Sequence, residues 1–206
     1  MKIAIIDYGM GNIKSLSSSL KNLGISDIIL SSDFDLLRSS DRLILPGVGS
    51  FGKAIQQIKS KNLDIILDEL VIREKKPILG ICLGMQLMGI SSNEDGYNKG
   101  LGFIKGIVEK FDPNLGKVPH VGFNQVMVDN NQKIYKNFNN SEYDFYFTHS
   151  YKMRNGLNVN NCLCNYNGCF VASFEFENIV GVQFHPELSQ KQGLKLITNF
   201  IENFNA

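Results

Sequence analysis

The sequence predicts an α/β protein in which a mostly parallel sheet with flanking helices is followed by an antiparallel, strand-rich second half. Up to about residue 96, short apolar runs typical of strands alternate with helix-like segments, which is the pattern of a parallel sheet with helices on both faces. After Gly96 this alternation stops, and short strand-like stretches dominate. The length of 206 residues fits one domain, so we expect residues 1–206 to form a single unit.

In the first half, short apolar runs bounded by turn residues predict strands at 3–7, 27–30, 42–45 and 78–81. Pro77 fits just before the last of these, because proline can open a strand but cannot lie in the middle of a sheet. Helices are predicted at 13–23, 34–38, 51–58 and 63–73, and the first of them ends near Gly24. In such sheets functional groups gather outside the carboxyl ends of the strands.

The second half predicts strands at 106–111, 121–128, 143–147, 159–165, 170–172 and 179–184. Asn167 followed by Gly168 is a strong hairpin signal, and it joins two of these strands. The closing segment 190–204 carries apolar residues on one helical face and predicts the last helix.

A short stretch around Cys82 gives the strongest indication of chemistry. Gly80 and Gly84 flank this cysteine at the spacing of a nucleophile elbow, a tight turn from strand to helix. Larger side chains at those two positions would collide, which explains the glycines. The turn places the sulfur at a helix N-terminus, where free N–H groups and the dipole favour a thiolate. A buried core cysteine beside ordinary glycines would show the same pattern.

A second segment, near the C-terminus, supplies a base and an acid. His185 follows the apolar strand at 179–184, and Pro186 keeps it extended because proline forbids helix continuation. Residues two apart in an extended chain share a face, so Glu187 can lie beside His185 and orient its ring. A thiol, an imidazole and a carboxylate together form a nucleophile, a base and an orienting acid. Glu175 and Glu177 are the nearest alternative acids in sequence.

Composition argues against several classes of function. The net charge of +1 gives no indication of nucleic-acid or anionic-membrane binding. No apolar run approaches the roughly 20 residues that a membrane helix needs. The first residues turn acidic too soon for a signal peptide, and we therefore expect a cytoplasmic protein.

Three of the four cysteines, Cys162, Cys164 and Cys169, cluster in the second half. Strand alternation puts Cys162 and Cys164 on one face, where small apolar side chains pack well. The cluster lacks a clear fourth metal ligand, so core packing is favoured over a metal site. A reducing cytosol fits this pattern better than an extracellular disulfide framework.

Together these motifs resemble the class I (triad) glutamine amidotransferases. The resemblance rests on two segments, Gly80-Ile81-Cys82-Leu83-Gly84-Met85-Gln86 and Gln183-Phe184-His185-Pro186-Glu187. Three further motifs narrow it to the HisH family, the glutaminase subunits of imidazole glycerol phosphate synthase: Pro46-Gly47-Val48-Gly49, Pro119-His120-Val121-Gly122-Phe123-Asn124 and His149-Ser150-Tyr151. The likeness runs nearly from end to end.

The resemblance implies the fold of that family, a flavodoxin-like arrangement with a mixed, mostly parallel central sheet. It also implies a glutaminase that hydrolyses L-glutamine to glutamate and ammonia through Cys82, His185 and Glu187. Neither a cofactor nor a metal is expected. The ammonia would pass to a cyclase subunit, a (βα)8 barrel resembling HisF, in a heterodimer that serves histidine biosynthesis.

The oxyanion hole is expected to use two backbone donors. The N–H of Leu83 directly follows the nucleophile and points at the developing oxyanion in any such elbow. The resemblance implies that the second donor is the N–H of Val48, after a peptide flip in a gating loop that contains Pro46, Gly47 and Gly49. Because Val48 is β-branched and resists positive φ, we expect the free subunit to hold this loop in an inactive state until its partner binds.

Glutamine binding is expected from Gln86, one helical turn past the nucleophile, although an exposed helix glutamine is the plainer interpretation. The resemblance adds His149, Ser150 and Tyr151 to the glutamine site. It also implies a docking face for the partner, for which the candidates are Asn12, His120, Val121, Phe123 and Asn124. Val121 and Phe123 lie two apart, so they could instead face the core.

Three alternatives stay open. A HisH paralogue could supply ammonia for amidination of a nucleotide-linked sugar in surface-glycan biosynthesis. Phe123 stands where the family usually has tryptophan, and Lys152 follows Tyr151 where a second aromatic is common. A cysteine α/β-hydrolase would fit the elbow, but in that class the acid precedes the histidine. The intact triad argues against an inactive binding scaffold.

Overall fold

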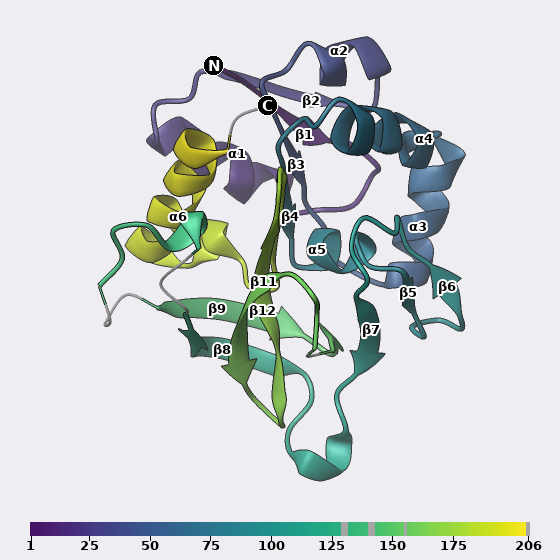
Figure 1. The fold of residues 1–206 in the computed structure, drawn as a ribbon, viewed down its shortest axis with the longest axis vertical. Coiled ribbons are helices and arrows are strands. Elements are labelled where there is room, and N and C mark those ends of the chain that lie inside the picture. The colour runs from purple at the N-terminus through teal and green to yellow at the C-terminus, as the bar shows by residue number, and fades with distance from the viewer. Residues whose placement is uncertain (129–131, 140–142, 155, 205–206) are drawn as a thin grey trace.

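The computed structural model describes residues 1–128, 132–139, 143–154 and 156–204, and within them it confirms the predicted α/β fold (Figure 1). The described residues form one large sheet with the strand order β2-β1-β3-β4-β13-β12-β11-β8-β9. The strands from β2 to β13 run parallel, and the later neighbours pair antiparallel. The parallel strands are β1 (Lys2–Ile6), β2 (Asp27–Ser31), β3 (Arg42–Leu45), β4 (Ile78–Ile81) and β13 (Ile179–Val182). The antiparallel strands are β8 (His120–Met127), β9 (Asp144–His149), β11 (Asn160–Asn165) and β12 (Cys169–Phe176).

Helices cover both faces of the parallel half. Successive residues of its strands are apolar and point to opposite faces, so both faces of the sheet are apolar. Ile3 and Ile5 of β1 pack with α1 (Ile13–Asn22) and α6 (Gln190–Asn203), whereas Ala4 and Ile6 pack with helices on the other face. These helices of the other face are α2 (Phe34–Arg38), α3 (Phe51–Ser60), α4 (Leu63–Leu67) and α5 (Leu83–Leu87). This period of two is the one expected of a strand buried on both sides.

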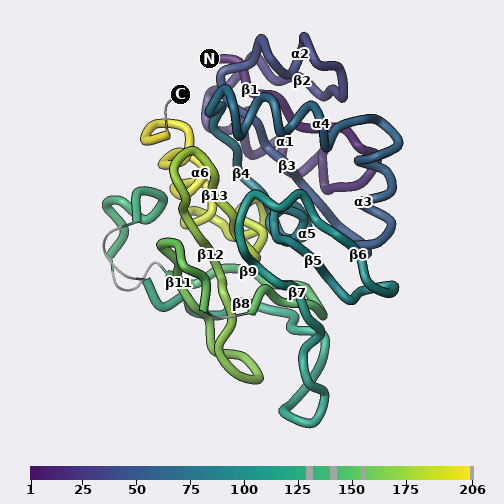
Figure 2. Tube along the Cα trace, turned by 45° about the vertical axis from the view of Figure 1, so that its right-hand side comes forward, coloured from purple at the N-terminus to yellow at the C-terminus, as the bar shows by residue number. Residues whose placement is uncertain are grey.

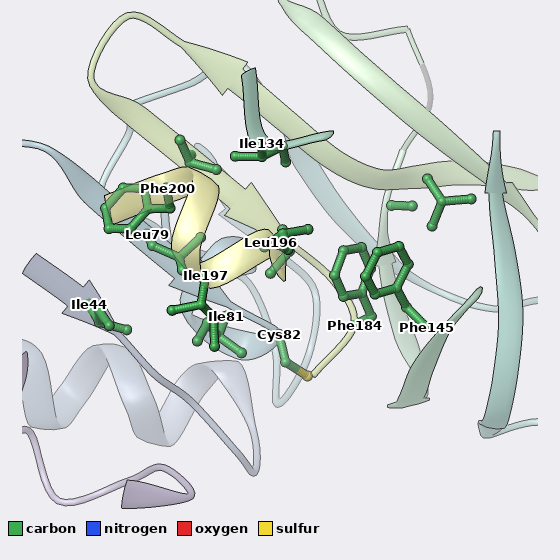
Figure 3. Close-up of a cluster of buried hydrophobic side chains, with 14 of the residues drawn as sticks. Ile44, Leu79, Ile81, Cys82, Ile134, Phe145, Phe184, Leu196, Ile197 and Phe200 are labelled. Carbon is green, nitrogen blue, oxygen red and sulfur yellow. The ribbon is translucent and has the colours of Figure 1, made fainter. Parts of the chain in front are cut away.

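On the α6 face, apolar side chains form a continuous cluster that runs from β3 and β4 toward the antiparallel half (Figure 3). Leu196, Ile197 and Phe200 of α6 pack over Leu79 and Ile81 of β4. Farther along, the ring of Phe184 stacks on that of Phe145 with centroids 4.1 Å apart. Cys82 lies at the edge of this cluster with its sulfur pointing away from it (Figure 3). The core therefore supports the elbow from one side and leaves its sulfur accessible from the other.

The structure differs from the predicted elements in three places. A second sheet of β10 (Tyr151–Met153), β7 (Ile107–Lys110), β5 (Ser91–Ser92) and β6 (Asn98–Lys99) lies beside α5 (Figure 2). Its two shortest strands are polar and carry no strand signal in the sequence. The predicted helix at 63–73 divides into α4 and a π-helix, Asp68–Arg73. The predicted strand at 179–184 ends at Val182, since His185 belongs to the segment that leaves the sheet.

Short 3-10 helices complete the fold at Pro113–Leu115, Lys133–Tyr135 and Pro186–Leu188. Across the described part of the chain, none of the helices combines the length and apolar character needed to cross a membrane.

Gly84 sets the spacing between α5 and β3, and its replacement tests the packing of the elbow. A Cβ built on Gly84 would approach the backbone carbonyl oxygen of Leu45 to 1.9 Å, so neither element could keep its place. We expect Gly84→Ala to lower the free energy of unfolding by about 3 kcal/mol or more, measured by denaturant titration.

Gly52→Ala in α3 is the matched control. There a Cβ meets only the side chains of Asn98 and Asp95, at 3.1 Å, and alanine favours the helix by about 1 kcal/mol. A Gly84→Ala protein as stable as the control would contradict the close approach of α5 to β3.

Candidate active site

The backbone at Cys82 has the sharp turn expected of an elbow. Cys82 is the one residue between β4 and α5, and its φ of 52° and ψ of −109° lie in a region that residues other than glycine rarely adopt. Its N–H donates to the carbonyl oxygen of Val182 at 2.8 Å, and its own carbonyl oxygen accepts from the N–H of Gln86 at 3.2 Å. Both backbone groups of the nucleophile are thus tied to neighbouring elements.

The two glycines flanking the elbow are needed for close packing. A Cβ at Gly80 would approach the N atom of Met85 in α5 to 2.8 Å, and a Cβ at Gly84 would overlap the backbone of β3. This agrees with the steric reason predicted from the spacing. The turn can therefore be tight only because both positions lack a side chain.

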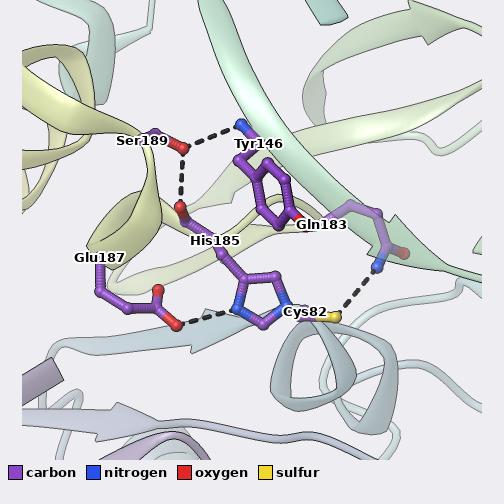
Figure 4. A network of polar contacts seen from close by, with 6 residues as sticks. All are labelled: Cys82, Tyr146, Gln183, His185, Glu187 and Ser189. Atoms are coloured by element: carbon purple, nitrogen blue, oxygen red, sulfur yellow. Dashed lines mark hydrogen bonds and ion pairs between the residues drawn. The ribbon is translucent and has the colours of Figure 1, made fainter. Parts of the chain in front are cut away.

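His185 reaches Cys82 because β13 lies beside β4. The two strands run parallel with Val182 opposite Ile81, so the segments that follow them leave the sheet at the same edge. The Nδ1 of His185 lies 2.8 Å from the Oε1 of Glu187, and both side chains are buried. In Figure 4 the other edge of the ring, which carries Nε2, faces Cys82. The three predicted residues thus meet in one place.

The surroundings of His185 favour its protonated form. Burial alone would lower its pKa, but the interactions with Cys82 and then with Glu187 outweigh burial and raise the pKa to about 10. The imidazolium form therefore prevails at neutral pH, ready to give up a proton. Within the described residues, Nε2 is buried and has no hydrogen-bond partner of good geometry, so this nitrogen remains available for a ligand.

The alternative acids are occupied elsewhere. Glu175 accepts a hydrogen bond from the N–H of Ile134 at 2.7 Å, and Glu177 forms an exposed ion pair with Lys75. Of these three acids, Glu187 is the one in contact with His185. His149 and His120 are buried, and burial is the main reason that their pKa values fall, to about 3 and about 4. These two rings are neutral at physiological pH.

A cavity of about 560 Å³ opens over the sulfur, within the usual size range of small-molecule sites. Cys82 and His185 both lie in its wall. The lining also includes these residues predicted from the sequence: Asn12, Val48, Gly49, Leu83, Gln86, His149, Ser150 and Tyr151.

The two residues predicted to supply the oxyanion donors line the same cavity as Cys82. Leu83 is the first residue of α5, so its N–H has no partner within the helix. Val48 is 42% exposed at the cavity mouth, and neither Gly47 nor Val48 has a positive φ. The loop is anchored at Pro46, whose carbonyl oxygen accepts from the hydroxyl of Tyr8 at 2.7 Å.

Gln86 is buried, which rules out the plainer interpretation of an exposed helix residue. Its Nε2 donates to the carbonyl oxygen of Tyr151 at 2.8 Å and to the Oε1 of Gln183 at 2.9 Å. Both N–H groups are thus used inside the protein, and its carbonyl oxygen is the group left to face a ligand.

Sequence reasoning missed Glu94, whose carboxylate lines the cavity. Its Oε2 accepts from the N–H of Phe51 at 2.8 Å, at the N-terminus of α3. Burial, the largest influence, raises the pKa of Glu94, and the hydrogen bond from Phe51 opposes it. Glu94 lies in a polar turn with no motif around it, so only the tertiary structure brings it to the site.

The predicted docking residues fall into two groups. Val121 is 56% exposed and Phe123 is 46% exposed, so both point outward from β8 rather than into the core. Asn124 is half-buried. His120 is only 2% exposed and its ring is sandwiched between Phe147 and Tyr166, so its prediction as a contact residue was wrong. Alternation along β8 turns His120 inward where Val121 and Phe123 turn outward.

Cys162 and Cys164 are buried in the core on the α6 side, as predicted, whereas Cys169 is exposed. Burial is the main cause that raises the pKa of Cys164 to about 12, which keeps it a thiol. The cluster lies outside the cavity lining.

The chain is similar to known proteins along nearly its whole length. The family model described as glutamine amidotransferase class-I matches residues 4–204. The chain is 43% identical over 204 residues to imidazole glycerol phosphate synthase subunit HisH 2 of Vibrio vulnificus, covering 98% of this chain and 94% of the relative. It is 40% identical over 201 residues to subunit HisH of Aquifex aeolicus, covering 97% and 96%. A solved glutamine amidotransferase has a similar fold, with a TM-score of 0.74 at 17% identity and coverage of 98% of both chains.

The contact between Glu187 and His185 predicts a shift in titration. We expect Glu187→Gln to lower the pKa of His185 from about 10, because the variant loses the negative charge that stabilises the imidazolium. As the pH rises, the ring in the variant should therefore lose its proton earlier, which NMR of the labelled histidine rings can follow.

Glu177→Gln is the matched control, since Glu177 lies in an exposed ion pair with Lys75. Equal titration midpoints of His185 in the Glu187 variant and in this control would show that another group holds the imidazolium.

Proposed function

The chain belongs to the class I glutamine amidotransferases, and from that premise we propose that it is the glutaminase subunit of imidazole glycerol phosphate synthase. Residues 1–206 would act as one glutaminase domain that hydrolyses L-glutamine and passes ammonia to a cyclase subunit in histidine biosynthesis. The observation that carries the proposal is the meeting of Cys82, His185 and Glu187 at a cavity of about 560 Å³.

The proposed reaction uses Cys82 as the nucleophile and His185 as the proton donor and acceptor. The Cys82 thiolate attacks the side-chain carbonyl carbon of glutamine, and the imidazolium of His185 gives its proton to the departing amide nitrogen. Ammonia leaves and a γ-glutamyl thioester remains on the sulfur. His185, now neutral, takes a proton from water, which attacks the thioester and releases glutamate and the Cys82 thiolate. Glu187 holds the ring in place and stabilises its charged form.

The oxyanion that forms in each step needs two donors. The N–H of Leu83 is one, and the N–H of Val48 is the proposed second, after the 46–49 loop has flipped. Tyr8 holds Pro46, and Gly47 lies so close to α5 that a Cβ on it would come within 2.8 Å of the N atom of Gly84. Only a residue without a side chain fits there. We propose that the loop flips while the triad stays in place. Loss of one such donor typically lowers turnover by about a hundred- to a thousandfold.

The cavity offers matching groups for the amino-acid end of glutamine. The carboxylate of Glu94 suits the α-ammonium group, and the carbonyl oxygen of Gln86 can accept a further hydrogen bond from it. Ser150 and Tyr151 also line the cavity and can offer backbone groups. His149 lines it as well, but its ring nitrogens are used within the protein, so we assign it no hydrogen bond to glutamine.

The outer face of β8 is the proposed docking surface for the cyclase subunit, which would be a (βα)8 barrel like HisF. It presents Val121, Phe123 and Met127, each at least 46% exposed, and aromatic residues often dominate such interfaces. The ring of Phe123 packs edge-to-face on Tyr146 at 5.6 Å. The carbonyl oxygen of Tyr146 in turn accepts from the backbone N–H of His185 at 2.8 Å. A partner docked on Phe123 would therefore be linked to His185 through Tyr146.

Asn12 lines the cavity together with Val48. This supports the proposal that Asn12 contacts the docked partner beside the gating loop. We also propose that the reaction takes place in the cytoplasm without nucleic acid or membrane, as the charge balance suggests.

A second candidate function differs only in the acceptor of ammonia. The chain could serve a synthase that amidinates a nucleotide-linked sugar in surface-glycan biosynthesis. The observation in its favour is Phe123, an exposed residue of the proposed docking face that departs from the tryptophan usual in the HisH family. Purification of the chain with a sugar-amidinating synthase, rather than with a cyclase, would favour this acceptor.

Removal of the nucleophile tests the proposed chemistry. We expect Cys82→Ala to lower glutamine hydrolysis by at least about 10⁴-fold, because no other group can form the thioester. Added ammonia should still drive the cyclase reaction of the complex, since that step needs no glutaminase. The measurements are glutamate release and cyclase product formation.

Cys169→Ser is the matched control, because Cys169 is exposed and lies outside the cavity. Full glutamine hydrolysis by Cys82→Ala, or its loss in the control, would overturn the assignment.

Docking on β8 should switch on the glutaminase. We expect addition of the cyclase subunit to raise glutamine turnover by about a hundredfold or more, because the loop then supplies its missing donor. In Phe123→Ala the same maximum should be reached only at about tenfold higher concentration of the partner. Titration of partner against glutamate release measures both quantities.

The control is Phe176→Ala, which removes an exposed aromatic residue of β12 that lies outside the proposed docking face. If the free chain already turns over at the full rate, the loop is not a gate. If Phe123→Ala lowers only the thermal midpoint, its ring has a structural role and the face is misassigned.

A further inference from the structure

The sulfur of Cys82 has a second polar neighbour besides His185. The Nε2 of Gln183 donates to this sulfur at 3.7 Å, and in Figure 4 it approaches from the side away from the imidazole. Gln183 has no exposed surface, so its N–H cannot be directed to solvent instead. An N–H donor at this position stabilises a sulfur that carries negative charge more than one that carries a proton.

The orientation of this amide follows from its other partners. The carbonyl oxygen of Tyr151 can only accept, so the group of Gln86 that contacts it at 2.8 Å must be the Nε2 nitrogen. The second N–H on that nitrogen points at Gln183 over 2.9 Å and needs an acceptor there, which is Oε1. The Nε2 of Gln183 is consequently the end that faces Cys82.

The carbonyl of Tyr151 is held from the other side by His149. The distance from its Nδ1 to this oxygen is 2.7 Å, and since a carbonyl cannot donate, Nδ1 must carry the proton. His149 is neutral, because burial above all lowers its pKa to about 3, so its Nε2 is an acceptor. The Nδ1 of His120, 3.2 Å away, must then donate to it.

Asn124 completes the chain at the other end. Its Oδ1 accepts from the N–H of Gln125 at 2.8 Å, which turns its Nδ2 toward the Nε2 of His120 at 3.4 Å. That nitrogen is an acceptor, since the proton of the neutral His120 ring is on Nδ1. A continuous set of hydrogen bonds with determined donors thus joins β8 to the nucleophile, through Asn124, His120, His149, the Tyr151 carbonyl, Gln86 and Gln183.

We propose that Gln183 is a further catalytic residue whose N–H stabilises the Cys82 thiolate, and that His149 and His120 are positioning residues that hold its amide in the required orientation. This inference rests on the proposed glutaminase function, because it concerns the same nucleophile. It also gives a role to two buried, neutral histidines that contact no member of the triad, of which His149 lines the cavity. A reversed amide at Gln183 would present an oxygen to the thiolate and repel it.

Alkylation of Cys82 by iodoacetamide tests the proposal without glutamine. The rate at a fixed pH is read from the peptide that contains Cys82, so that modification of the exposed Cys169 does not interfere. Because one hydrogen bond to a charged group is lost, we expect Gln183→Met to slow alkylation about tenfold. Gln132→Met is the matched control, a buried glutamine outside the cavity, and should react at the wild-type rate.

Gln183→Glu provides a second, nearly isosteric variant in case the methionine variant does not fold. It keeps an acceptor for Gln86 but replaces the N–H beside the sulfur with oxygen, so its alkylation should be slowed at least as much. Wild-type rates in the folded variants would overturn the role of Gln183.

His120→Phe tests the positioning role, because phenylalanine keeps the ring stack with Phe147 and Tyr166 but removes both nitrogens. We expect His120→Phe to be alkylated severalfold more slowly than wild type. The double variant with Gln183→Met should be alkylated no more slowly than Gln183→Met alone. A merely structural effect of His120 would instead multiply with that of Gln183, and this result would overturn the positioning role.

NMR of the histidine rings gives an independent readout. His120 and His149 should both carry their proton on Nδ1, and an Nε2-protonated ring at either position would contradict the chain. Glutamine hydrolysis by the wild-type protein in complex with the cyclase subunit is measured separately. Its absence would refute the proposed function, whereas normal hydrolysis by the complex with unaltered alkylation in the Gln183 variants would refute only this inference.

Discussion

The site depends on one constrained residue, Cys82, which alone turns the chain from β4 into α5. Its backbone lies in a region that costs about 1–3 kcal/mol for a residue with a side chain, so the surrounding structure must hold it there. Hydrogen bonds tie its N–H to β13 and its carbonyl to α5, and Gly84 lets α5 press directly on the backbone of β3. This backbone conformation directs the sulfur into the cavity and places it beside the free N–H groups at the start of α5.

The second requirement is that β13, more than ninety residues later in the chain, pairs in parallel with β4. This pairing brings the ends of the two strands to the same edge of the sheet. The position of His185 and Glu187 beside Cys82 follows from it. His185 itself is extended, but Pro186 opens the 3-10 helix Pro186–Leu188. That turn, rather than an extended run, brings Glu187 to His185 at 2.8 Å. The apolar cluster beneath, with Phe184 stacked on Phe145, keeps the His185 segment from shifting relative to the elbow. The segment from Phe184 to Glu187 therefore contributes both to the apolar core and to the candidate active site.

The triad and the parallel half of the sheet could be predicted from sequence because their signals are local: a glycine spacing, a His-Pro-Glu motif and short apolar strands. The predicted extended conformation holds for His185 but not for Glu187, which lies in a 3-10 helix. The burial of His120 could not be predicted in this way. Strand alternation puts His120 on the opposite face from Val121 and Phe123, but it does not tell which of the two faces the rest of the protein covers. Glu94 and Gln183 acquire their roles through contacts with residues far away in the chain, Phe51 for the first and Cys82 for the second. The two-residue strands β5 and β6 likewise form by pairing alone, without any preference of their own residues.

The central claim is that glutamine is cleaved through a covalent bond to the sulfur of Cys82. The most direct measurement is mass spectrometry of the protein complex, quenched in acid during turnover of glutamine and digested into peptides. The account predicts a γ-glutamyl adduct on the peptide that contains Cys82, lost on incubation with base, and none on the peptides that contain Cys162, Cys164 or Cys169. Steady turnover with no adduct on Cys82, or an adduct on another cysteine, would contradict it.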